Sequence, residues 1–174
     1  MIKVELGGGT KGRGDGFINV DICQTADVVH DLNVMPWPFD DESVDEVYSS
    51  HCIEHVNCHV SFMHQIARIC KVGAKVEIRC PDAAGEMAMC AGHKHVVSID
   101  SMRHMDHVFA AAHWAGHSRK LKLLEIEPGC DDYWFPLARN NPLFSAWTDM
   151  DILTWLPRCR HENRFRFVVE PCMY

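Results

Sequence analysis

The loop after the first apolar run of the chain contains residues whose types and spacing suit ligand binding. Gly7, Gly8 and Gly9 follow the run KVEL, and a second run, FINV, ends in Asp21. Glycine permits positive φ and lets a ligand approach the backbone without a Cβ in the way. A carboxylate beside such a loop can accept hydrogen bonds from both hydroxyls of a ribose. The pattern predicts a nucleoside site, and the alternative is a glycine-rich hairpin with a solvated aspartate.

The same loop satisfies the GxGxxG pattern of nicotinamide and flavin sites through Gly7, Gly9 and Gly12. That pattern needs a helix that begins at the glycines and binds a pyrophosphate at its N-terminus. Only the ten residues from Gly7 to Gly16 join the two predicted strands. Because a full helix does not fit in this length, a ligand without a pyrophosphate is favoured.

His51, Glu54 and His55 form a second cluster, with the spacing HxxEH. An imidazole with a pKa near 6.5 is a competent general base at neutral pH, and a nearby glutamate can orient it. The same spacing is the zinc signature of inverted zincin peptidases, in which two histidines share one helical face. Such a peptidase needs a further carboxylate ligand and a cleft, which the sequence does not identify. We therefore expect no metal, and a zinc hydrolase is the less favoured alternative.

Short runs rich in valine and isoleucine surround these clusters and predict an α/β fold. The expected strands are 2–6, 17–21, 27–30, 44–49 and 75–80. Between the last two, apolar residues recur at steps of three and four and predict one helix over 52–71, with Gly73 as a stop just beyond it. A strand, helix and strand in this order indicate a parallel sheet.

The second half of the chain gives weaker patterns. We expect short helices at 82–91 and 149–156, an amphipathic helix at 102–116, and strands at 121–127 and 164–170. Aromatic residues between those strands could line an acceptor pocket, form a homodimer contact or fill a satellite core: Trp134, Phe135, Trp147 and Trp155. We expect the histidines of this half to be scattered over the surface: His93, His95, His104, His107, His113 and His117.

Composition narrows the class of protein. The chain has 174 residues with 47% hydrophobic and 24% charged residues, which is ordinary for one globular domain. A formal charge of -7 disfavours nucleic acid as a partner, and no apolar run approaches the roughly 18 residues of a membrane helix. Nine cysteines without a CxxC pair, and a start without a charged and apolar leader, favour a reduced cytoplasmic setting.

Five segments together resemble the class I S-adenosylmethionine-dependent methyltransferase family, in the small branch with a shortened first crossover. They are ELGGG (5–9), INVD (18–21), VVHDL (28–32), LNVMPWPFDDESVDEVYSSHCIEHV (32–56) and RICKVGAKVEIRCPD (68–82). In that family these are the cofactor loop, the ribose acid, the turn beside the adenine, the fourth strand with its helix, and the turn into the fifth strand. Two positions depart from the family pattern: the loop reads GGG, and Ala74 replaces a customary glycine.

The resemblance implies a single doubly wound, mostly parallel, Rossmann-like sheet over 1–174, with an antiparallel strand among the last two. Residues 1–82 would form the cofactor half and 83–174 the acceptor or cap half. S-adenosylmethionine would be the cofactor. Glu5 would hold its amino-acid end, Asp21 its ribose, and Asp31 and Leu32 would edge the adenine. The full set of expected cofactor residues is Glu5, Gly7, Gly8, Gly9, Asp21, Asp31, Leu32 and Ser49.

We expect methyl transfer from S-adenosylmethionine to an oxygen or nitrogen of a small-molecule acceptor. His51 follows directly on the strand 44–49, at the edge of a parallel sheet where ligands bind. Either His51 or His55 could take the acceptor proton, with Glu54 orienting the imidazole. The alternative from another class is a protein that binds or consumes S-adenosylmethionine without a methyl acceptor.

Overall fold

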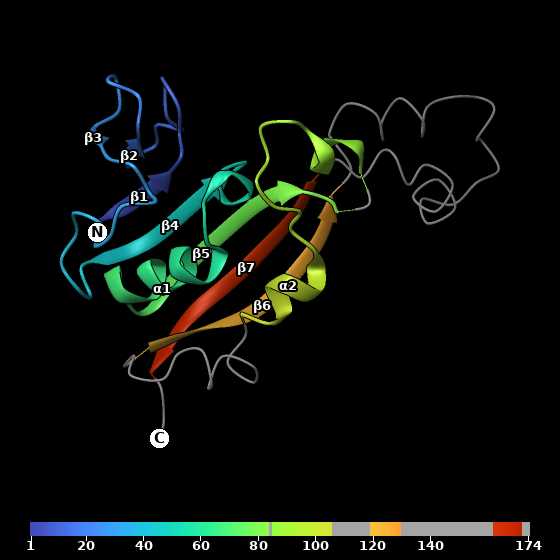
Figure 1. The fold of residues 1–174 in the computed structure, drawn as a ribbon. Coiled ribbons are helices and arrows are strands. Elements are labelled where there is room, and N and C mark those ends of the chain that lie inside the picture. The colour runs from blue at the N-terminus through green and yellow to red at the C-terminus, as the bar shows by residue number, and fades with distance from the viewer. Residues whose placement is uncertain (84, 106–118, 130–161, 172–174) are drawn as a thin grey trace, which may run out of the picture.

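The structure is a computed structural model that describes residues 1–83, 85–105, 119–129 and 162–171. These residues contain a seven-stranded sheet in the order β3-β2-β1-β4-β5-β7-β6 (Figure 1). The strands are β1 (Lys3–Leu6), β2 (Phe17–Asp21), β3 (Val28–Val29), β4 (Val44–Ser50), β5 (Cys70–Pro81), β6 (Arg119–Gly129) and β7 (Glu162–Pro171). The first five are parallel, whereas β7 runs antiparallel to both β5 and β6. The expected mostly parallel, Rossmann-like sheet is confirmed.

The position of β1 determines where a ligand can bind. β1 pairs with β2 on one side and with β4 on the other, so the chain changes direction across the sheet after β3. In open sheets of this kind, ligands bind beyond the carboxyl ends of the strands at such a switch point. The residues that follow Leu6 and Ser50, and the last residue of β2, are therefore the ones to examine.

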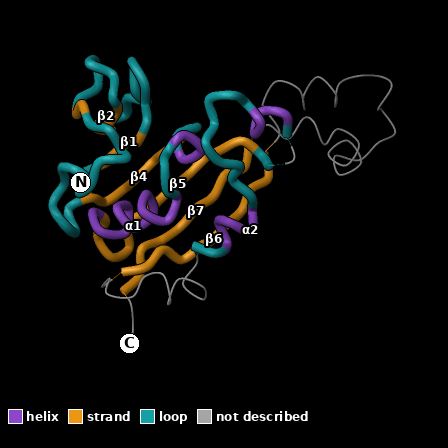
Figure 2. Tube along the Cα trace, in the orientation of Figure 1, coloured by secondary structure: helices purple, strands orange, loops and turns teal. Residues whose placement is uncertain are grey.

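One face of the sheet is apolar and forms the core. Alternate side chains of the strands point to this face, among them Val4, Leu6, Val47, Ile78 and Phe165, all at most 1% exposed. Helix α1 (His59–Ile69) packs on it through buried residues that recur at steps of three and four, and Met102 of α2 (Ile99–Arg103) joins the same cluster. Figures 1 and 2 show both helices on the same side of the sheet. This layer fixes β4 and β5 beneath the candidate site.

The opposite face carries polar, half-buried side chains. The guanidinium of Arg13 lies 4.0 Å from the ring centre of Tyr48, and Glu77 forms ion pairs with Arg79 and Arg166. Neither α1 nor α2 covers this face in the described part of the chain. The ion pair between Glu77 and Arg166 therefore connects β5 to β7 across the sheet.

The helix expected over 52–71 is wrong in its first third. A 3-10 helix, η1 (Ile53–His55), is followed by extended backbone at Val56, with φ -78° and ψ 158°, before α1 begins. The N–H of Asn57 donates to Oδ1 of Asn33 at 2.7 Å, so a contact with the loop before β4 replaces a helical hydrogen bond. The spacing of apolar residues could not reveal this break, because a 3-10 turn also repeats every three residues.

Other boundaries also differ from the expectation. β5 begins at Cys70, so Gly73 lies inside the strand with φ +84° instead of ending a helix. The helix expected at 82–91 is only η2 (Glu86–Met89), and the strands expected at 121–127 and 164–170 are confirmed within β6 and β7. Most of the helix expected at 102–116 lies outside the described residues. The aromatic segment 133–155 and the helix expected at 149–156 lie wholly outside them. Among the described helices, none is long and apolar enough to cross a membrane.

Candidate cofactor site

The bend after β1 requires glycine at its first position. Gly7 has φ +76°, and its N–H donates to the carbonyl of Val20 at 2.8 Å, which ties the bend to β2. A Cβ at Gly7 would lie 2.6 Å from both Cβ and Sγ of Cys52, which follows β4. Real side chains do not approach this closely. The glycine therefore lets the ends of β1 and β4 meet at the floor of the site.

Glu5 supports the glycine loop from behind. Glu5 is 6% exposed, and its carboxylate accepts a hydrogen bond from the backbone N–H of Arg13. A Cβ at Gly8 would lie 2.7 Å from Oε2 of Glu5, so this glycine is also constrained by packing. Neither Glu5 nor Gly8 lines the cavity described below. Their positions support a role in shaping the loop.

Asp21 joins the loop to the end of β2. Its Oδ2 accepts from the N–H of Gly9 and its Oδ1 from the N–H of Cys23, each at 2.9 Å. Partial burial raises the pKa of Asp21, but these backbone donors outweigh it and hold the pKa below the ordinary value. The carboxylate lines the cavity, so a ligand there can also donate to it. The acid and the glycine loop are adjacent, as a ribose site needs.

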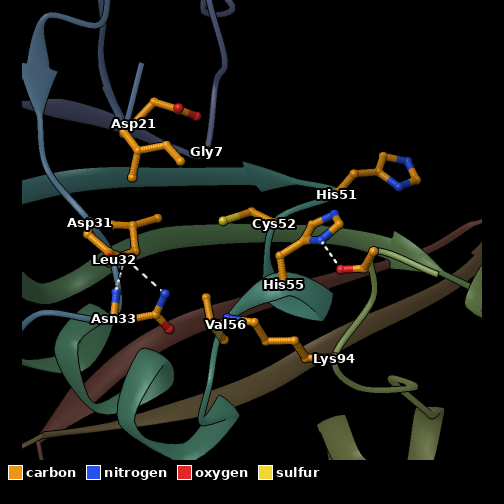
Figure 3. Close-up of a pocket in the computed structure, with 12 residues that line it drawn as sticks. Gly7, Asp21, Asp31, Leu32, Asn33, His51, Cys52, His55, Val56 and Lys94 are labelled. Carbon is orange, nitrogen blue, oxygen red and sulfur yellow. Dashed lines mark hydrogen bonds between the residues drawn. The ribbon is translucent and has the colours of Figure 1, made fainter. Parts of the chain in front are cut away.

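A cavity of about 440 Å³ opens beside these residues (Figure 3). Six of the expected residues line it: Gly7, Asp21, Asp31, Leu32, His51 and His55. Six more line it that the sequence did not single out: Ile22, Asn33, Cys52, Val56, Gly92 and Lys94. Its volume lies in the range of pockets for small molecules and cofactors, about 300–1,000 Å³.

The turn after β3 forms one wall of the cavity. Oδ1 of Asp31 accepts from the backbone N–H and from Nδ2 of Asn33, both at 2.9 Å, which fixes the turn. These two hydrogen bonds hold the pKa of Asp31 below its ordinary value, and the one from the backbone N–H has the larger effect. The carbonyl of Leu32 accepts from Nε1 of Trp37 at 3.1 Å, and Leu32 itself is 7% exposed. An apolar side chain held in this way suits the face of an adenine.

Ser49 does not reach the cavity. Its side chain is fully buried, and its Oγ donates to the carbonyl of Leu6 at 3.1 Å. The hydroxyl thus links β4 to the end of β1. Cys52 does line the cavity, but burial raises the pKa of its thiol to about 12, so the sulfur carries its proton and is a poor nucleophile.

His51 lies between two carboxylates. Its Nδ1 is 3.4 Å from Oε1 of Glu54, and its Nε2 is 3.4 Å from Oε2 of Glu162 on β7. These carboxylates raise the pKa of His51 to about 9, and Glu162 has the largest effect. Burial opposes the shift. The expected pKa near 6.5 is wrong for this arrangement. An imidazole that already carries its second proton at neutral pH cannot accept another.

His55 has a different environment. Its exposed ring lines the cavity, and its Nδ1 bonds to the carbonyl of Gly92 at 2.9 Å, the dashed line in Figure 3. Because a carbonyl only accepts, the proton lies on Nδ1 and the lone pair on Nε2. Glu54 is 1% exposed and does not line the cavity. His55 is thus the histidine at the cavity with an available lone pair.

Residues 14–78 match the model of a methyltransferase domain family. No curated protein matches the sequence at a significant level. Several solved structures share the fold across nearly the whole chain. The Haloferax volcanii protein solved in complex with the methyltransferase activator Trm112 is 18% identical, with a TM-score of 0.65, over 99% of this chain and 83% of that one.

Two further structures agree with this match. An S-adenosylmethionine-dependent methyltransferase of Mesorhizobium loti is 12% identical, with a TM-score of 0.62, over 96% of this chain and 90% of that one. Phosphoethanolamine N-methyltransferase 2 of Haemonchus contortus, solved with S-adenosyl-L-methionine, is 17% identical, with a TM-score of 0.56, over 99% of this chain and 49% of that one.

The strand order and the loop after β1 are those of a Rossmann-like methyltransferase fold. Residues 14–78, which match the methyltransferase-domain model, lie within this fold, and the chain is therefore similar to solved S-adenosylmethionine-dependent methyltransferases. The residues fit S-adenosylmethionine: a backbone bend at Gly7, a carboxylate at Asp21 and an apolar wall at Leu32 all line the one cavity.

Proposed function

We propose that the chain transfers the methyl group of S-adenosylmethionine to an oxygen or nitrogen of a small-molecule acceptor. One observation carries the proposal: a single cavity is lined by Gly7, Asp21 and Leu32 and also by His51 and His55. The first three suit an adenosine, and the last two bring proton-carrying groups to the same space. The net charge of -7 argues against a nucleic-acid acceptor.

The cofactor, when bound, supplies a methyl group on an electrophilic sulfonium. Gly7 lets the ligand lie against the backbone, while Asp21 accepts from the ribose hydroxyls and Leu32 packs on the adenine. Methyl transfer is an in-line displacement, so most of the acceleration comes from holding donor and acceptor aligned. The fixed bend and the fixed turn therefore contribute more than any single acid or base.

A hydroxyl acceptor must also lose a proton. Nε2 of His55 holds the free lone pair, and its Nδ1–H stays bonded to the carbonyl of Gly92 as the ring becomes charged. As the nucleophile bonds to the methyl carbon, the C–S bond electrons go to sulfur and the acceptor proton goes to Nε2. Base catalysis of this kind contributes about 10²–10⁴-fold in rate.

The test uses S-adenosylmethionine labelled on its methyl group and a panel of small hydroxyl and amine compounds. Label is expected in at least one compound, and His55→Ala should slow transfer to a hydroxyl by about 10²–10⁴-fold while leaving cofactor affinity unchanged. His104→Ala, at the exposed end of α2, serves as the matched control. Tight cofactor binding without label in any compound would favour a protein that binds or consumes S-adenosylmethionine.

A further inference from the structure

Three side chains come together from two segments of the chain, and one of them, His55, lines the cavity. Glu54, His55 and His93 each offer a ligand atom, and these atoms lie within 4.8 Å of one another. The rings of His55 and His93 meet edge to face with centres 4.8 Å apart. Ligands of a tetrahedral ion lie about 3.3 Å apart, so these atoms need to approach one another by at most about 1.5 Å to bind a metal. The expectation that the later histidines are scattered is wrong for His93.

Among the residues that the structure describes, the carboxylate of Glu54 is buried with one charged neighbour and no hydrogen bond. Glu54 is 1% exposed, yet neither of its oxygens accepts a hydrogen bond within the described part of the chain. The nearest positive group is Nδ1 of His51, at 3.4 Å from Oε1. Buried carboxylates are normally hydrogen-bonded, because removing their charge from water without a donor is unfavourable. A cation bound beside Glu54 would satisfy these oxygens.

The two imidazoles are prepared for the same ion. Nδ1 of His93 is buried and has no hydrogen-bond partner among the described residues. His55 donates its Nδ1–H to the carbonyl of Gly92, which leaves the Nε2 lone pair for a metal. Histidine ligands of metals are commonly held by such a hydrogen bond from the other ring nitrogen.

Backbone contacts hold the two ligand segments together. The N–H groups of Lys94 and His95 donate to the carbonyl of Glu54 at 2.9 and 3.3 Å, and the N–H of His93 donates to the carbonyl of Cys90 at 2.9 Å. These backbone hydrogen bonds therefore fix the turn after η2 against η1. A site whose ligand segments are already positioned loses little conformational entropy when it binds a metal.

We propose that Glu54, His55 and His93 bind a zinc ion. Two imidazoles and one carboxylate favour zinc over magnesium or calcium, which prefer oxygen ligands. Three protein ligands leave a fourth position open, as in catalytic zinc sites. The site differs from the pair that HxxEH suggests, because His51 contacts Glu54 and Glu162 and serves as an outer partner of the Glu54 ligand.

The site also bears on the chemistry of the cavity, an inference that rests on the proposed function. A zinc ion at Nε2 of His55 uses the lone pair that would otherwise accept a proton. Zinc lowers the pKa of a bound hydroxyl, so the ion would take over activation of a hydroxyl acceptor from the free imidazole.

The test titrates zinc alone into the full chain, with a competing chelator and without S-adenosylmethionine. We expect one zinc per chain, and at least about tenfold weaker binding in both His93→Ala and Glu54→Gln. His104→Ala, an exposed histidine outside the cluster, should bind as tightly as the unchanged chain. Circular dichroism checks whether Glu54→Gln is folded. If it is not, the test depends on His93→Ala, because His93 is only partly buried.

The chain has nine cysteines, which could also bind zinc. The absorption spectrum of the chain loaded with cobalt in place of zinc distinguishes the two kinds of site. The cobalt-loaded chain should show tetrahedral absorption without a thiolate charge-transfer band. The proposal is overturned by a thiolate band, by less than one zinc per chain, or by unchanged affinity in His93→Ala. Cofactor binding, measured separately, tells the two proposals apart: zinc binding without cofactor binding would refute only the proposed function.

Discussion

The backbone N–H of Gly9, in the loop after β1, donates a 2.9 Å hydrogen bond to Oδ2 of Asp21, the last residue of β2. This hydrogen bond holds the glycine loop against Asp21. The other carboxylate oxygen accepts from the N–H of Cys23, which fixes the orientation of the side chain. Any ligand that bonds to Asp21 therefore meets the backbone of the loop as well. The predictions below follow from this arrangement and from the packing that supports it.

Replacing Gly7 with alanine should be more damaging than replacing Gly9. Both glycines have positive φ, which costs about 1–2 kcal/mol for a residue with a Cβ. At Gly9 a Cβ meets nothing within 4 Å, whereas at Gly7 it would lie 2.6 Å from Cys52. Overpacking adds roughly 1–3 kcal/mol. Urea unfolding of the two variants checks this, and equal losses would contradict the close packing of Gly7 on Cys52.

Trp37→Phe should destabilise the chain and loosen the wall of the cavity. Trp37 is 2% exposed, lies edge to face with Phe62 at 5.2 Å, and donates its Nε1–H to the carbonyl of Leu32. Phenylalanine keeps most of the packing but leaves a buried carbonyl without a donor, at a cost of about 1–3 kcal/mol. Calorimetry should also find weaker binding of the cofactor, because Leu32 lines the cavity. Unchanged unfolding and unchanged binding would show that this hydrogen bond has no role.

Glu77→Gln should lower stability at pH 7 but not in acid. Burial raises the pKa of Glu77, but Arg166 and Arg79 outweigh it, so the pKa lies below its ordinary value. A lowered pKa stabilises the fold above the pKa of the unfolded chain, and this contribution is lost as the pH falls through the folded pKa. Because the side chain is 26% exposed, we expect about 1 kcal/mol at pH 7.

The measurement for Glu77 is the midpoint of urea unfolding for both chains between pH 7 and pH 3. The two midpoints should approach each other below about pH 5 as the glutamate takes up its proton. A gap between the midpoints that stays constant over this range would mean that the side chain acts through shape and not through its charge.

The parts of the site that sequence could predict are those set by local pattern. The short run before Gly7 and the run that ends in Asp21 are strands with the expected character, and β2 has the expected bounds. Glycines in a ten-residue connection leave few other geometries, so the loop and the acid were predictable from spacing.

The remaining residues were hidden because tertiary contacts place them. Glu162 reaches His51 only through the antiparallel pairing of β7 with β5, and no local pattern marks it. The N–H of Asn57 bonds to Asn33, which breaks a helix that periodicity predicts as continuous. His93 meets His55 because two backbone hydrogen bonds fold its segment onto η1. Only its proximity in sequence to other histidines could have drawn attention to it.

Calorimetry of the demethylated cofactor, S-adenosylhomocysteine, with Asp21→Ala tests the central claim most directly. Asp15→Ala, which removes an exposed carboxylate of the same loop, is the matched control. The unchanged chain and Asp15→Ala should bind with similar affinity. Asp21→Ala should bind about 10- to 150-fold more weakly, which corresponds to about 1.5–3 kcal/mol. Equal affinity in all three chains would contradict a ribose held between the glycine loop and Asp21.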